Sequence, residues 1–63
     1  MTRKDKEKIL TTVNEKLQDM CAIERQFAVT LKERKAGMIN TLYLIGVINA
    51  VESSEMLKKY NAG

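Results

Sequence analysis

The chain has 63 residues, with 11 Lys plus Arg against 8 Asp plus Glu, a formal net charge of +3, no His, no Pro, no Trp and a single Cys. Zinc sites, Ser–His or Cys–His nucleophilic dyads and disulfide frameworks need residues that are missing here or present once. The sequence also shows no glycine-rich phosphate loop. We therefore expect a protein that is not an enzyme and that takes no cofactor, metal ion or small-molecule substrate.

Length and composition predict one small helical domain. A chain of this size buries only about 60% of the surface that its unfolded form exposes, so a single domain over residues 1–63 is expected. Apolar residues make up 44% and charged residues 30% of the chain, a balance typical of folded proteins. With no Pro and three Gly, helix is favoured over most of the length, and the predicted fold class is all-α.

The first predicted helix runs from about residue 3 to residue 35. Apolar residues alternate at spacings of three and four, which is the pattern of one helix face. They are Leu10, Val13, Leu17, Met20, Phe27 and Leu31. Two patterns resemble a capping box and could start the helix, and the earlier one is favoured: Thr2 with Asp5, and Thr12 with Glu15. Residues 1–8 are expected to form a basic arm that can fray.

A turn is predicted at residues 36–37, followed by a second helix over about residues 38–59. Lys32, Arg34 and Lys35 stand just before Gly37. Cations suit the last free carbonyls of a helix, and glycine then adopts positive φ without a Cβ clash. The segment 38–51 carries no charge and is apolar on all sides. One neighbouring helix cannot cover it.

Three alternatives for this region stay open. Its β-branched residues favour a strand, although they do not alternate with polar residues. Gly37 could lie inside one continuous helix, at a cost of about 1 kcal/mol relative to Ala, which would give a rod. The third alternative is insertion into a membrane, and it is disfavoured because the uncharged stretch 36–51 is shorter than the roughly 20 residues that cross a bilayer. No membrane partner is expected, and because no apolar run follows the basic N-terminal residues, a cytoplasmic location is predicted.

An antiparallel two-helix hairpin places residues whose numbers sum to about 73 opposite one another. Leu31 then faces Leu42, Phe27 falls between Ile45 and Gly46, and Glu24 faces Asn49. Glu24 interrupts an apolar stripe, and a charge there is costly unless it is paired or reaches water. Polar groups inside bundles can fix register and oligomeric state, so Glu24 and Asn49 form a hypothetical specificity layer. The alternative is that Glu24 turns sideways into solvent.

The apolar second helix predicts a partner, because soluble monomers rarely expose a wide apolar face. The predicted interface consists of Tyr43, Leu44, Val47, Ile48 and Val51. Two hairpins could pair through it into a four-helix bundle, or the face could dock on a larger protein. The leading functional hypothesis is therefore a small interaction module that acts as a regulator, adaptor or inhibitor.

Basic residues near the N-terminus suggest a second hypothesis, and they are Arg3, Lys4, Lys6 and Lys8. The hairpin plan resembles the small helical hairpins of plasmid copy-number regulators that bind RNA and of secretion-system co-chaperones. That resemblance implies, as the alternative function, a ROP-like dimeric RNA-binding regulator. No residue motif accompanies the resemblance, and Asp5 and Glu7 dilute the basic cluster, so nucleic acid ranks second as a partner. Cys21 is interpreted as a small apolar residue on a helix rather than a reactive thiol.

Overall fold

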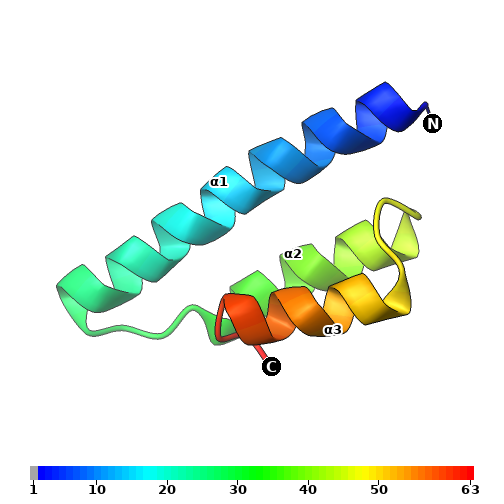
Figure 1. Ribbon diagram of the computed structural model, residues 1–63. Helices are drawn as coiled ribbons and strands as arrows, with labels where there is room; N and C mark the ends of the chain where they lie inside the picture. Colours follow the sequence, from blue (N-terminus) through cyan, green and yellow to red (C-terminus); the bar gives the residue numbers. More distant parts are fainter. Residues whose placement is uncertain (1) are drawn as a thin grey trace.

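The computed structural model describes residues 2–63 and contains three helices, α1 (Arg3–Phe27), α2 (Lys32–Leu44) and α3 (Ala50–Lys59). The chain reverses direction after α1 and again after α2 (Figure 1). Helix α2 packs against both α1 and α3, and the molecule measures 38 × 19 × 14 Å. The all-α prediction is confirmed, whereas the two-helix hairpin with helices over 3–35 and 38–59 is wrong.

Helix α1 begins at the earlier of the two capping boxes. The Asp5 N–H donates to Thr2 Oγ1 at 3.2 Å, and the Thr2 N–H donates to Asp5 Oδ2 at 3.4 Å. These two bonds satisfy N–H groups that the first helical turn would otherwise leave without acceptors. Residues 3–8 therefore belong to a capped helix.

The first reversal lies at residues 28–31 rather than 36–37. Ala28 takes a left-handed conformation with φ of 53°, and the Leu31 N–H donates to Glu24 Oε2 at 2.7 Å. In a continuing helix that N–H would bond to the Phe27 carbonyl. Gly37 lies inside α2, so Lys32, Arg34 and Lys35 occupy the first turn of a helix and not the last turn.

The second reversal occurs at residues 45–49 and was not predicted. Gly46 has φ of +81° and follows the C-cap residue Ile45. The Gly46 N–H donates to the Tyr43 carbonyl at 3.1 Å and the Val47 N–H to the Leu42 carbonyl at 2.9 Å, which is a Schellman motif. Glycine is favoured here because the left-handed region is costly for a residue with a Cβ.

Helix α3 is capped at both ends. At its start, the Glu52 N–H donates to Asn49 Oδ1 at 2.8 Å and the Asn49 N–H to Glu52 Oε1 at 3.0 Å. At its end, Asn61 takes a φ of 56° and the Ala62 N–H donates to the Leu57 carbonyl at 2.7 Å. A ten-residue helix gains much from such caps, because short helices are marginal in water.

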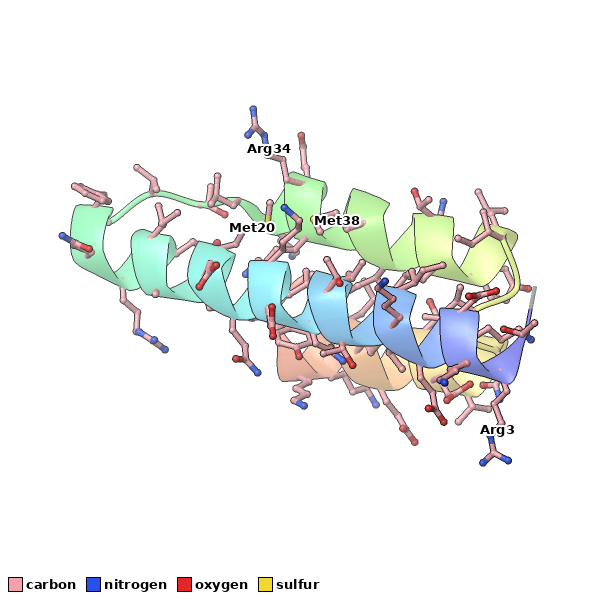
Figure 2. All side chains as sticks on the ribbon, turned by 90° about the horizontal axis from the view of Figure 1, so that it is seen from above. Arg3, Met20, Arg34 and Met38 are labelled. Carbon is pink, nitrogen blue, oxygen red and sulfur yellow. The ribbon has the colours of Figure 1, made fainter. Side chains whose placement is uncertain are left out.

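One core joins the three helices. Its buried apolar members are Leu17, Ile39, Leu42, Ile48, Met56, Tyr60 and Ala62. Met20 and Met38 pack against this core from the space between α1 and α2 (Figure 2). The predicted core position of Phe27 is wrong, because its side chain is 62% exposed. Phe27 is the last residue of α1, beyond the point at which α2 covers that helix.

Gly37 lies inside α2 and Gly46 lies in a turn, so alanine substitutions at these two positions should have opposite effects on stability. Gly37→Ala should stabilise the protein by about 0.5 to 1 kcal/mol, because Gly37 is helical and an added Cβ meets nothing within 4 Å. Gly46→Ala should destabilise it by roughly 1 kcal/mol or more, because the positive φ is strained for alanine. Urea unfolding followed by circular dichroism measures both. A loss of stability in Gly37→Ala would place the turn back at Gly37.

Candidate functional site

A buried lysine connects the three helices. The Lys35 side chain is fully buried, and its ammonium donates to a Glu24 carboxylate oxygen, to the Tyr60 carbonyl at 2.6 Å and to Cys21 Sγ at 3.9 Å. An ammonium has three N–H donors, and all three are used here. We call Cys21, Glu24, Lys35 and Tyr60 the lysine cluster. Its members come from α1, α2 and the C-cap of α3.

Helix ends explain why a cation is favoured at this position. The Tyr60 carbonyl belongs to the last turn of α3, where carbonyls lack partners within the helix and the helix dipole favours positive charge. The Glu24 carboxylate lies at the start of α2, where the dipole favours negative charge, and accepts the Leu31 N–H at the N-cap. The lysine cluster therefore satisfies the end of one helix and the start of another.

Further contacts tie α3 to α1. The Tyr60 hydroxyl donates to Asn14 Oδ1 at 2.7 Å, and the Cys21 thiol lies 3.7 Å from the Tyr60 carbonyl oxygen. Cys21 is half-buried and hydrogen-bonded within the lysine cluster, so its surroundings are more polar than the sequence interpretation assumed. Since every Lys35 donor is already bonded inside the protein, the lysine cluster acts as a structural junction.

The geometry also holds the Glu24 carboxyl in its charged form. The Leu31 N–H, and after it the Lys35 ammonium, keep the pKa of Glu24 below its usual value. Both partners bind the carboxylate more strongly than the neutral acid. A group with a lowered folded-state pKa stabilises the protein above its unfolded-state pKa, and this contribution is lost as the pH falls through the folded-state value.

Exposed apolar side chains gather where α2 ends and α3 begins. We call this group the corner cluster: Tyr43, Leu44, Ile45 and Val51, which are 44%, 72%, 49% and 67% exposed. The turn that places them there depends on Gly46. Ile45 was not predicted as a surface residue, because the hairpin scheme placed it in the core opposite Phe27.

Two members of the predicted interface lie elsewhere. Ile48 is 5% exposed and belongs to the core of its own chain, so its placement on a free interface is wrong. Val47 is half-buried against that core. Tyr43, Leu44 and Val51 remain exposed. Ile48 faces inward because the unpredicted turn at residues 45–49 redirects the chain immediately before α3.

The predicted pairing of Glu24 with Asn49 is also wrong. Glu24 binds Leu31 and Lys35, while Asn49 caps α3 through Glu52. The alternative in which Glu24 turns into solvent is wrong as well, because its side chain is 18% exposed and ion-paired. Whether Glu24 affects oligomeric state stays a prediction.

The basic arm lies on the exposed surface of the first turns of α1, and its residues are Arg3, Lys4, Lys6 and Lys8. Arg3 forms an exposed ion pair with Glu7, at 3.7 Å between Nε and Oε1. Such pairs contribute little to stability, but this one offsets part of the positive charge.

Comparisons of the chain with protein-family models, with curated proteins and with solved structures found no match. Among residues 2–63, no group of three or more Cys, Asp or Glu side chains is placed to hold a metal ion. Within the same residues, no helix combines the length and the apolar character that crossing a bilayer requires.

Removing one partner of the buried ion pair should be more harmful than removing both. Glu24→Gln leaves the Lys35 ammonium buried without a counter-charge and should lower the melting temperature by several degrees. The double variant Glu24→Leu, Lys35→Met should recover much of that loss, because apolar groups of similar size can replace a buried pair. Thermal unfolding of the wild type, Glu24→Gln, Glu24→Leu, Lys35→Met and the double variant tests this. Additive losses would contradict a coupled pair.

Acid should remove the contribution of Glu24. At neutral pH the wild type should be more stable than Glu24→Gln, and this difference should shrink as the pH falls below the usual glutamate value of about 4.3 and through the lowered pKa of Glu24. The sign follows from the uptake of a proton by the Glu24 carboxylate on acid unfolding. Melting temperatures of both proteins between neutral and strongly acidic pH measure the effect. A difference that is independent of pH would contradict it.

Proposed function

We propose that this chain is a small non-enzymatic interaction module that binds a protein surface through the corner cluster, with a second copy of the chain as its first partner. The observation that carries the proposal is the exposure of Leu44 and Val51, at 72% and 67%. Burying such side chains contributes about 25 cal/mol per Å² before the costs of association. A chain this short gains much stability when a partner covers these side chains.

A second copy suits the corner cluster for two reasons. A two-fold interface is formed by the same patch of both chains, so the corner cluster of one chain covers the corner cluster of the other. Tyr43 adds an aromatic ring that carries a polar hydroxyl, and tyrosine is enriched at interfaces. Because residues 2–63 of each chain form three helices, such a dimer would contain six helices from these residues. The four-helix bundle expected from a two-helix hairpin no longer describes it.

Within the cell, we place this module in the cytoplasm as a regulator, adaptor or inhibitor that acts by occupying a surface. The single Cys, which cannot form an internal disulfide, supports a reducing compartment. A larger protein that covers the corner cluster is the rival partner. Binding of RNA through the basic arm stays a second prediction, and it has less support because Asp5 and Glu7 offset the cations there.

Leu44→Asp should abolish self-association while leaving the fold intact, because the side chain is exposed and a charge cannot be buried unpaired at an interface. Light scattering across a concentration series measures the mass, and circular dichroism checks helicity. Phe27→Ser is the matched control: it removes a similarly exposed apolar residue from the opposite end of the molecule and should leave the mass unchanged. Ile48→Asp is not a suitable test, because Ile48 is buried and its loss should unfold the chain.

A wild type that stays monomeric at the highest concentration would contradict self-association. Repeating the mass measurement with Glu24→Leu tests the specificity hypothesis for that residue. An unchanged mass would remove it.

A further inference from the structure

Cations outnumber carboxylates around the connection between α1 and α2. Two open pockets meet at Thr30, in the connection between α1 and α2. Their charged lining residues are Arg25, Lys32, Arg34, Lys35 and Lys59, with Glu24 and Glu33. These five cations and two carboxylates account for the whole formal net charge of +3, since the other six cations and six carboxylates of the sequence cancel.

Four of these cations form no ion pair among residues 2–63, and one of them, Lys59, lies over the Tyr60 ring at 5.4 Å. Lys35 is buried and bonded to Glu24, and the other ion pair among residues 2–63 is that of Arg3 with Glu7. The exposed cations of this end are Arg25, Lys32, Arg34 and Lys59. Figure 2 shows the Arg34 side chain projecting away from the helices. Glu33 is the one exposed carboxylate that lines these two pockets.

One exposed apolar side chain of this end, Val29, lines one of the two open pockets together with Arg25 and Lys59. We call Ile23, Phe27 and Val29 the tip cluster, and they are 42%, 62% and 48% exposed. The end of α1 and the connection that follows it extend beyond the ends of α2 and α3 (Figure 1). The tip cluster is therefore part of a projecting end that a flat surface could approach.

We propose that this end binds the surface of an anionic phospholipid bilayer, with the tip cluster entering the interface and the four exposed cations contacting headgroups. Apolar insertion and electrostatic attraction to anionic lipids combine in such peripheral binding, which needs no spanning helix. The expectation of no membrane partner rested on the length of the uncharged stretch 36–51, and this proposal departs from it. The cytoplasmic leaflet carries anionic lipids, so the required surface is present in the proposed compartment. Reversible, salt-sensitive binding is expected.

The composition of the tip cluster favours a bilayer over single-stranded nucleic acid. Nucleic-acid surfaces combine cations with aromatic rings on which bases stack. Here two of the three exposed apolar residues, Ile23 and Val29, are aliphatic and offer no ring for stacking, whereas their methyl groups gain free energy on entering the acyl region. The projecting shape also differs from the grooves that hold a single strand.

Two single-tryptophan variants test the proposal, because the chain contains no Trp. Phe27→Trp reports on the tip cluster, and Val51→Trp, at a similarly exposed site in the corner cluster, is the matched control. Vesicles of phosphatidylcholine with phosphatidylserine should shift the Phe27→Trp emission to the blue at low salt. Phosphatidylcholine alone should not, and the Val51→Trp emission should stay unchanged with both.

Vesicle sedimentation separates the contribution of the cations to bilayer binding from the contribution of the apolar side chains. Arg34→Gln should lower the partition coefficient about fivefold, whereas Lys16→Gln, an exposed cation outside the tip, should change it little. Phe27→Ser should lower it roughly tenfold. Circular dichroism verifies that each variant is folded.

Absence of a shift in Phe27→Trp, equal shifts in both reporters or equal binding to neutral vesicles would overturn the proposal. A response of Phe27→Trp to single-stranded RNA without a response to anionic vesicles would also overturn it and identify nucleic acid as the partner. Repeating the titration with Leu44→Asp in the Phe27→Trp background tests whether bilayer binding is independent of self-association. The proposal requires the shift to persist there.

Discussion

The fold depends on the burial of one ammonium group. Lys35 is fully buried, yet it contacts a carboxylate on α1, a carbonyl at the end of α3 and a thiol on α1. A buried charge is tolerated when it is paired and its donors are satisfied, and costly otherwise. Because the acceptors lie on two other segments, the ammonium is satisfied only when the three helices have met. This contact therefore favours one arrangement of the helices over other compact arrangements of the same apolar residues.

The lysine cluster also affects which apolar side chains stay exposed at the two ends of the molecule. It draws the end of α3 toward α1 and the start of α2, while the tight turn at Gly46 sends the corner cluster to the opposite end. Polar anchoring at one end and a backbone turn at the other leave two separate apolar groups exposed. The tip cluster includes Val29, which lines a pocket with Arg25 and Lys59, whereas the segment 38–51 that holds the corner cluster carries no charge. This difference is why the two groups are assigned different partners.

Several features could be read from the sequence because they depend on neighbouring residues. The all-α class follows from composition, and the start of α1 follows from the Thr2 and Asp5 pattern, which forms the capping box observed. The sequence also identified Glu24 as a charge that required a partner. It did not identify Lys35, because eleven residues separate the two and a contact over that distance exists only after the chain has turned between them. The cations around Lys35 resembled a helix C-terminus and directed the prediction to Gly37.

The sequence by itself determined the helical class, the cap of the first helix and the surplus of apolar residues, since these follow from local propensity and composition. Tertiary structure decided where the helices break. The Leu31 N–H leaves the helical pattern for the Glu24 carboxylate, and Gly46 rather than Gly37 takes positive φ. It also decided that Ile48 is buried while Phe27 is exposed. Burial depends on which segments cover a residue, and that is settled only when the three helices pack around Lys35.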